Sequence, residues 1–531
     1  DQSGGLSPYR AGLRAETANK HGMNTPRLAV LAAAAVVSGL LVPGLSVSAA
    51  AAPATTNACL QSVPDKGSTK PQQICYTVFK PAGADAAHRV PMIFHSHGWA
   101  GSRTTTAASF DTFLKAGYGV LSFDQRGFGE SGGKARIENI EYEGKDVAKL
   151  VELVSKLSWV QQDGKGDPRL GAIGGSYGGG YQFVGAFREL MDRKKPVFDA
   201  LAPEITWWDL KQSLAPQEVT RTEWVSLLTA GGAQALPDEA IQGTALGAAT
   251  GLWPKGQVPG TPDLDAFFLK NGPAWHVSQG RRLDIPVLFG QGITDTLFPL
   301  HQGLQNWAKA LTPAARARSI FVGYNGGHVL PNAFPYTPAV AGDPCSKKLA
   351  GGSFRDLTLR FFDHALKGKK PSLKGYGEFH LATAGNTCTT TRSVTANASY
   401  PVGPVATSAA AGAPLAFKVA DGPLRIAGTP YLDGTLFAAG VNNRAFYGLA
   451  VGTSPADAQL VQGNVLPLNE LLPVAGEKRS IELPSVAVDV PKGQSLFVLA
   501  SAVSDMFAAM GSRTPGAVVL QDAAVRLPVV R

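Results

Sequence analysis

The sequence has few charged residues and lacks the common nucleotide and metal motifs. Charged residues make up 17% of the 531 residues and hydrophobic residues 44%, a balance that excludes a disordered chain. The 61 glycines follow no G-X-Y period, so a collagen-like chain is excluded. Lysine and arginine give a net charge of +9 but are scattered rather than clustered into a nucleic-acid-binding stripe. Neither a P-loop nor an HExxH motif is present. We therefore expect no nucleic-acid partner, no metal and no cofactor.

Cysteine is also scarce, with only Cys59, Cys75, Cys345 and Cys388 in the chain. None of them forms a CxxC pair, which argues against a zinc site. None stands at a strand-to-helix turn, which argues against a nucleophilic cysteine. An even number of cysteines behind an export signal favours disulfides. Of the three possible connectivities we favour the local one, Cys59–Cys75 and Cys345–Cys388.

The N-terminal region has the pattern of an export signal. Met23 begins a short charged segment, the apolar run Leu28–Leu45 follows, and small residues suited to cleavage come next. The alternative is a membrane anchor, but this run is at the lower length limit for a span and contains glycine and proline. We expect residues 23–52 to be a signal peptide of a secreted or extracytoplasmic protein with no stable membrane partner. Residues 1–22 would be an upstream extension.

The middle of the chain alternates apolar strand patterns with helical spacing. The expected strands are Val90–Ser96, Tyr118–Asp124, Leu170–Ile173, Phe198–Ile205, Ile285–Gly290 and Ser319–Val322. The expected helices are Glu138–Leu157, Tyr177–Leu190, Leu300–Leu311 and Ser353–Leu366. Strands separated by helices predict a doubly wound, mostly parallel sheet with helices on both faces.

Two regions depart from this alternation. Residues 206–283 are too long for a bare loop and contain helical spacing, which predicts a helical cap inserted into the α/β domain. From about residue 377 the helices stop, and short β-rich segments punctuated by glycine and proline predict an all-β sandwich. We expect an α/β domain over 53–400 that contains the cap, and a β-sandwich over 401–531. Residues 401–413 would join the two.

The region of alternating strands and helices contains one candidate nucleophile. The segment Gly174-Gly175-Ser176-Tyr177-Gly178 fits G-x-S-x-G, with a strand before it and a helix after it. This is the setting of a nucleophile elbow, in which the serine Oγ is exposed above the sheet at a helix N-terminus. The alternative is a glycine-rich turn with a structural serine.

The partners of such a serine follow in the order acid, histidine. Asp295 comes just after an expected strand; its alternative role is to cap the helix at Leu300. His328 follows the next strand in a glycine-containing loop, whereas the other later histidines lie too close to Asp295, inside a helix or in the β-rich region. We expect His328 to accept the proton of Ser176 and Asp295 to orient the imidazole.

An oxyanion would need donors already in place. We expect them to be the backbone N–H groups of Tyr177 and Trp99, the latter in the loop after the first expected strand. A competing motif, Gly127–Gly132, matches G-x-G-x-x-G. A dinucleotide site requires a helix to begin at once, and here the next helical spacing starts near Glu138, so we reject that interpretation.

The sequence resembles two groups of known proteins. Asp124-Gln125-Arg126-Gly127-Phe128-Gly129-Glu130-Ser131, the elbow and the expected triad resemble the α/β-hydrolase superfamily over about 75–370. The segment Ala202–Leu210, the cap and the β-rich C-terminus resemble the Xaa-Pro dipeptidyl-peptidase and cocaine esterase family, whose members add a helical cap and a jelly-roll domain. Members often place a tyrosine side chain in the oxyanion loop. Here that loop reads His97-Gly98-Trp99, so backbone donation is expected instead.

This resemblance implies hydrolysis of esters or X-Pro-type peptide bonds. Together with the expected signal peptide and triad, it leads us to expect a secreted serine hydrolase that acts on a small-molecule or peptide substrate through an acyl-enzyme. Two alternatives stay open: a carboxylesterase on other acyl or polymeric esters without peptidase activity, and a non-catalytic binding protein. Trp207 and Trp208 could line a substrate pocket or pack the cap. Glu204 and Asp209 could hold a substrate amine or anchor the cap. The oligomeric state and the role of the sandwich stay open.

Overall fold

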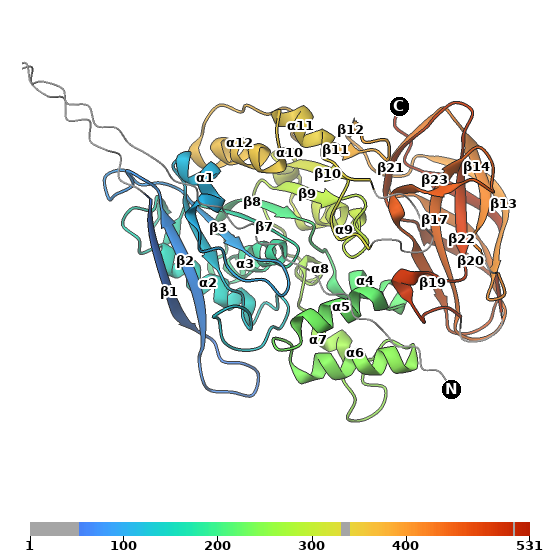
Figure 1. Ribbon diagram of the computed structural model, residues 1–531, viewed down its shortest axis with the longest axis horizontal. Coiled ribbons are helices and arrows are strands. Elements are labelled where there is room, and N and C mark those ends of the chain that lie inside the picture. The colour runs from blue at the N-terminus through green and yellow to red at the C-terminus, as the bar shows by residue number, and fades with distance from the viewer. Residues whose placement is uncertain (1–52, 331–339, 412, 513–515) are drawn as a thin grey trace, which may run out of the picture. The chain divides into compact units, whose positions relative to one another are not determined.

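The computed structural model describes residues 53–330, 340–411, 413–512 and 516–531. The expected upstream extension and signal peptide lie outside the described residues. Figure 1 shows an α/β region, a group of cap helices and a C-terminal β region following one another along the chain.

A mixed sheet forms the centre of the α/β region. In the described residues it contains ten strands in the order β1-β2-β4-β3-β7-β8-β9-β10-β11-β12. Their bounds are β1 Ala54–Ser62, β2 Gln72–Lys80, β3 Met92–Ser96, β4 Gly119–Phe123, β7 Leu170–Gly175, β8 Phe198–Glu204, β9 Leu288–Gly292, β10 Ile320–Tyr324, β11 Phe379–Ala382 and β12 Cys388–Thr391. From β4 to β11 neighbouring strands run parallel, and the outer strands pair antiparallel. The predicted mostly parallel sheet is therefore confirmed.

Helices cover both faces of this sheet (Figure 1). Helices α2 (Glu143–Val154) and α3 (Tyr177–Arg193) contribute to one apolar core, and α1 (Asp111–Lys115) and α12 (Phe354–Lys367) to another. Helix α2 begins five residues later than expected because Ile137 and Glu138 have φ angles of 58° and 57°, outside the right-handed helical region. The remaining elements here are the hairpin β5 Gln162–Gly164 and β6 Asp167–Pro168, with α9 Leu300–Gln305, α10 Pro313–Ala317 and α11 Pro344–Ala350.

The cap helices lie between β8 and β9, in a segment described throughout. They are α4 Leu210–Leu214, α5 Thr222–Gly232, α6 Asp238–Thr250, α7 Leu264–Phe268 and α8 Pro273–Ser278. Side chains of α6 and α7 form a small apolar core that includes Trp253 between these two helices. Trp99 and Ile137 of the α/β region pack against this core, so it joins the cap to that region.

The C-terminal region is built from antiparallel sheets, as the all-β prediction required. Among the described residues one sheet has the order β13-β23-β16-β20, and another has β14-β22-β17-β18 with β19 paired to β17. The strands are β13 Ala398–Ser408, β14 Leu415–Asp421, β15 Leu424–Gly428, β16 Tyr431–Ala438, β17 Asn443–Gly452, β18 Gln459–Leu460, β19 Leu466–Glu470, β20 Val474–Glu482, β21 Val486–Val490, β22 Ser495–Ser501 and β23 Ala517–Leu527. Inward-facing aliphatic side chains of both sheets share one core, which is typical of a sandwich.

One expectation about this region is wrong. Residues 401–413 are not simply a linker, because β13 runs through them to Ser408. The register between β13 and β23 shifts between Pro401 and Gly403 and again between Gly403 and Val405. Bulges of this kind let proline and glycine stand inside a strand pair, so a composition typical of a linker can still be a strand.

Both favoured disulfides are present. Cys59 and Cys75 face each other in the β1–β2 register with a Cα–Cα distance of 3.9 Å, and Cys345 of α11 is joined to Cys388 of β12. Two disulfides indicate that the protein folds in an oxidising environment. Within the described ranges, no helix combines the length and apolar character that a membrane crossing requires.

Candidate active site

Ser176 occupies a strained turn between β7 and α3. Its φ and ψ are 57° and −122°, a conformation that non-glycine residues rarely adopt outside functional turns. The turn depends on its glycines. A Cβ added to Gly174 would lie 2.5 Å from the carbonyl oxygen of Gly178, and one added to Gly178 would lie 2.4 Å from that of Ser96. The G-x-S-x-G pattern is therefore required by close backbone packing, and it holds the serine at the carboxyl end of the sheet.

The structure brings the three expected catalytic side chains together. His328 Nε2 lies 2.8 Å from Ser176 Oγ, and His328 Nδ1 lies 2.7 Å from Asp295 Oδ2. Ser176 follows β7, Asp295 follows β9 and His328 follows β10, so three parallel strands deliver one side chain each to the same edge. These distances allow a proton to pass from the hydroxyl to the imidazole.

Asp295 is fully buried and hydrogen-bonded at both carboxylate oxygens. Oδ1 accepts from the backbone N–H groups of Leu297 and Phe298, at 2.9 and 2.6 Å, and Oδ2 also accepts from the backbone of His328 at 3.0 Å. A Cβ at Gly327 would approach Oδ2 to 2.5 Å, so this glycine permits the contact. The alternative role of Asp295 as the cap of α9 does not apply, because Pro299 holds that position.

The two expected oxyanion donors lie beside the serine. Tyr177 is the first residue of α3, and a Cβ on Gly98, next to Trp99, would lie 4.0 Å from Ser176 Cβ. Among the described residues, neither the Tyr177 nor the Trp99 backbone N–H has a protein acceptor. Two unused N–H groups next to the nucleophile match the arrangement of an oxyanion hole.

Gln125 connects the two donor segments, a role that the sequence interpretation did not assign. Its side-chain amide donates to the carbonyl oxygens of His97 and Tyr177, both at 3.3 Å. His97 in turn bonds the carbonyl of Gly98 through Nδ1 at 2.8 Å and accepts the backbone N–H of Gln125 at Nε2. Burial lowers the pKa of His97, which favours the neutral ring that can donate at one nitrogen and accept at the other.

The rest of the segment after β4 has a structural role. Asp124 and Arg126, both fully buried, form ion pairs with Arg103 and with Asp146. A Cβ on Gly129 would overlap the Asp124 carboxylate at 2.3 Å. Gly129 of the G-x-G-x-x-G match therefore makes room for a buried carboxylate.

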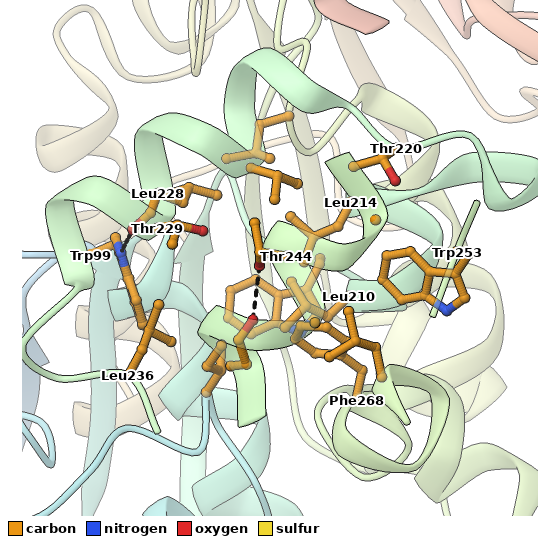
Figure 2. Close-up of a pocket in the computed structure, with 18 of the residues that line it drawn as sticks. Trp99, Leu210, Leu214, Thr220, Leu228, Thr229, Leu236, Thr244, Trp253 and Phe268 are labelled. Carbon is orange, nitrogen blue, oxygen red and sulfur yellow. Dashed lines mark hydrogen bonds between the residues drawn. The ribbon is translucent and has the colours of Figure 1, made fainter. Parts of the chain in front are cut away.

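A cavity opens between Ser176 and the cap (Figure 2). It comprises about 850 Å³ of empty space, including the part that opens to solvent. Ser176, Tyr177 and Trp207 line one part of it, and side chains of α4, α5, α6 and α7 and of the neighbouring loops line the rest. Of the residues expected to contact substrate, only Trp207 faces this cavity.

Residues 72–329 match the family model of the X-Pro dipeptidyl-peptidases (S15 family). With the sheet, the elbow and the cap on the same residues, this match decides the assignment. Residues 72–329 belong to the X-Pro dipeptidyl-peptidase (S15) family.

Among the curated proteins, the similarity covers a short segment of this chain. An uncharacterised 31.7 kDa protein of Escherichia coli is 32% identical over 115 residues, which are 21% of this chain and 37% of that protein. The chain thus spans little more than a third of the length of the curated relative.

Solved structures extend the likeness of fold to nearly the whole chain. An aminopeptidase from a Thaumarchaeota archaeon has a TM-score of 0.62 at 13% identity, covering 90% of this chain and 97% of that one. An α-amino acid ester hydrolase gives 0.61 at 14% identity over 93% and 100%. A CocE/NonD family hydrolase from Staphylococcus aureus gives 0.57 at 12% identity over 92% and 99%.

Substrate contact and a structural role both stayed open for Glu204 at the end of β8 and for Trp208 and Asp209 after it, and all three make structural contacts. The Trp208 ring packs in the main core behind the site, and its backbone N–H donates to Gln302 at 2.8 Å. Asp209 caps α4 through the backbone N–H of Gln212. Glu204 accepts the Tyr324 hydroxyl at 3.1 Å, and burial raises its pKa to about 7. None of the three lines the cavity.

Proposed function

We propose that this protein is a serine hydrolase that cleaves carboxylic ester or X-Pro-type peptide bonds through an acyl-enzyme. One observation carries the proposal: the continuous hydrogen-bonded chain Ser176–His328–Asp295, at 2.8 and 2.7 Å, at the mouth of a cavity. The resemblance of the fold to an aminopeptidase and to an α-amino acid ester hydrolase supports the same reaction class.

In the first half of the reaction, Ser176 Oγ attacks the substrate carbonyl carbon while His328 Nε2 takes the hydroxyl proton. Asp295, held by backbone N–H groups, stabilises the imidazolium that forms. The carbonyl oxygen becomes an oxyanion, which the N–H groups of Tyr177 and Trp99 are placed to receive. The intermediate then expels the alcohol or amine, which leaves with the proton from His328.

In the second half, water attacks the acyl-enzyme and gives its proton to His328. Collapse of the second tetrahedral intermediate releases the acid and returns the proton to Ser176. Aromatic rings shield the imidazole during both halves. Phe298 and Trp224 lie edge-on to His328, with ring centroids 5.2 and 5.8 Å away. This apolar surrounding strengthens the hydrogen bonds of the triad by excluding water.

We also infer that the protein is secreted and that its partner is a small-molecule or peptide substrate rather than a nucleic acid. The disulfides and the export-signal pattern support secretion. The scattered positive charges support a small substrate over a polyanion.

The test compares wild type, Ser176→Ala and the exposed-serine control Ser158→Ala as full chains. The substrates are p-nitrophenyl butyrate and Gly-Pro-p-nitroanilide. We expect Ser176→Ala to lose at least about 10³-fold in kcat on any substrate that wild type hydrolyses, because the nucleophile is gone. Ser158→Ala should match wild type, and a fluorophosphonate should label wild type at Ser176. Equal turnover by wild type and Ser176→Ala, or labelling elsewhere, would reject the triad.

A binding protein that has kept the hydrolase fold is the second candidate from the sequence. It predicts no fluorophosphonate adduct and no turnover of either substrate. The unused backbone N–H groups beside Ser176 argue against it, since a structural serine would not need them.

A further inference from the structure

The cavity above Ser176 has an unusual chemical character for a family whose peptidase substrates carry an N-terminal amine. No carboxylate, amine, guanidinium or imidazole occurs among its lining side chains, all of which are described. Aliphatic and aromatic groups dominate instead. Figure 2 shows several converging from separate cap helices, among them Leu210, Leu214, Leu228 and Phe268.

The polar atoms of the lining tryptophans are directed away from a ligand. The indole N–H of Trp99 donates to the Leu228 carbonyl at 2.8 Å, that of Trp207 to the Asn271 carbonyl at 2.6 Å, and that of Trp253 to Asp265 at 2.7 Å. Because each indole is satisfied within the protein, the three rings present only apolar surface to the cavity.

The same holds for a threonine of the cap. The Thr244 hydroxyl donates to the carbonyl of Ala240 one turn earlier in α6, at 2.9 Å. Hydroxyl groups are the strongest polar groups left around the cavity, and a hydroxyl cannot neutralise a cation.

Nearby carboxylates are not available to a ligand cation. Asp265 pairs with Lys211, and Glu239 pairs with Arg136 and Lys66. Glu138 lies in a separate small cavity beyond the Trp207 ring. Its burial raises its pKa well above the usual range, which favours the uncharged carboxyl.

Resting on the proposed function, we propose that this cavity is an acyl pocket for uncharged, apolar acyl groups and that it rejects an α-ammonium. The reason is physical: a buried ammonium needs a counter-ion, and the lining supplies none. The natural substrate class is therefore a carboxylic ester with an aliphatic or aryl acyl group, and neither an α-aminoacyl ester nor an N-terminal dipeptide. The reaction is the one derived above, with an alcohol as leaving group.

The decisive experiment uses two esters that differ only in the amine. These are p-nitrophenyl 4-methylpentanoate and L-leucine p-nitrophenyl ester, assayed at pH 6 so that the amine is protonated, with the Ser176→Ala rate subtracted. We expect kcat/KM to favour the uncharged ester by about 100-fold or more, because the ammonium would be buried unpaired. Equal or faster cleavage of the leucine ester would overturn the proposal. No serine-dependent cleavage of either ester would instead overturn the proposed function.

A second pair of variants tests the location of the pocket. Ala240 of α6 lines the cavity and is 5% exposed, whereas Ala245 on the same helix is exposed and does not line it. Ala240→Phe should lower the ratio of octanoyl to acetyl p-nitrophenyl ester turnover by about tenfold, since the ring occupies the space of the chain. Ala245→Phe should leave the ratio at the wild-type value. An unchanged ratio in a folded Ala240→Phe protein would place the acyl group elsewhere.

Glu138→Gln tests the rival explanation that the buried carboxyl holds an amine. The substitution keeps the shape of the side chain and removes its ability to ionise. We expect the ratio between the two leucine-shaped esters to stay as in wild type. A selective loss of leucine ester cleavage in this variant would show that Glu138 is the amine partner and would overturn the proposal.

Discussion

The two sides of the active site differ in polarity. On the sheet side, Ser176, Asp295 and His328 are joined by hydrogen bonds of 2.7 to 2.8 Å, and the carboxylate is further fixed by backbone N–H groups. On the cap side, the lining side chains carry no formal charge and the indole N–H groups are directed away from the cavity. The polar side is fixed for one reaction, whereas the apolar side sets which acyl group can enter.

This difference separates chemistry from substrate choice. Polar groups must keep their geometry, because a misplaced donor or acceptor costs the transition state much of its stabilisation. An apolar pocket needs only volume and shape, so its residues can vary among related proteins. The family assignment of the α/β domain therefore says more about the triad than about the substrate.

The largest expected effect comes from breaking the polar side at Asp295. Asp295→Asn keeps the shape of the side chain but favours the wrong tautomer of His328, so kcat should fall by about 10⁴-fold. Ester turnover at pH 7 measures the loss, with Asp111→Asn, at a partly exposed position away from the site, as control. A loss below tenfold would mean that Asp295 only shapes its loop.

A smaller effect is expected at Gln125, a positioning residue that holds both donor segments. Gln125→Leu should lower kcat by about 10- to 100-fold, less than the loss of a donor itself, and change KM little. The split between kcat and KM distinguishes positioning from general damage, which thermal unfolding would reveal. An unchanged kcat would show that backbone packing alone holds the donors.

The sequence predicted the polar catalytic residues better than the residues that surround the substrate. The elbow at Ser176 was predictable because its glycines are needed within five residues, and Asp295 and His328 because loops after parallel strands meet at one edge. Gln125 was missed although it stands inside a quoted segment, since no spacing rule identifies a side chain that bridges two loops. Trp208 could not be assigned to the pocket or to packing, because it lies in the loop after β8, where no periodicity shows which side chain faces the cavity.

The limits in the fold have similar causes. Strand β13 was taken for part of a linker because its proline and glycine are tolerated only through bulges that depend on the partner strand β23. The cap cavity could not be read from sequence at all. It arises where four short helices meet, and nothing in their spacing shows which apolar side chains face an empty volume.

The boundary between the two sides can be tested at Gly232 of α5. A Cβ there would lie 2.3 Å from the Trp99 ring, whose indole is held by α5 through Leu228. Gly232→Ala should displace Trp99, whose backbone N–H is an expected oxyanion donor, and lower kcat by roughly tenfold or less. Gly231→Ala, whose Cβ would meet nothing closer than 3.6 Å, is the matched control. Equal rates in both variants would show that the cap and the oxyanion loop are uncoupled.

The smallest effect is expected on protein stability, from the ionisable side chain of Glu204. Burial raises the pKa of Glu204 from its ordinary 4.5 to about 7. Between these values the folded protein holds more protons at this site than the unfolded chain does, so the free energy of unfolding decreases as pH rises from about 5 to 8.

Glu204→Gln removes this titrating group while keeping an acceptor for the Tyr324 hydroxyl. The decrease in unfolding free energy between pH 5 and 8 should then be smaller than in wild type by about 1–3 kcal/mol. Urea unfolding at both pH values measures it, and the exposed variant Glu477→Gln should keep the wild-type decrease. Because Glu204 does not line the cavity, the ester selectivity of the Glu204→Gln variant should equal that of wild type. A Glu204→Gln variant that kept the wild-type pH dependence but lost ester selectivity would show that Glu204 contacts the substrate and does not have a purely structural role.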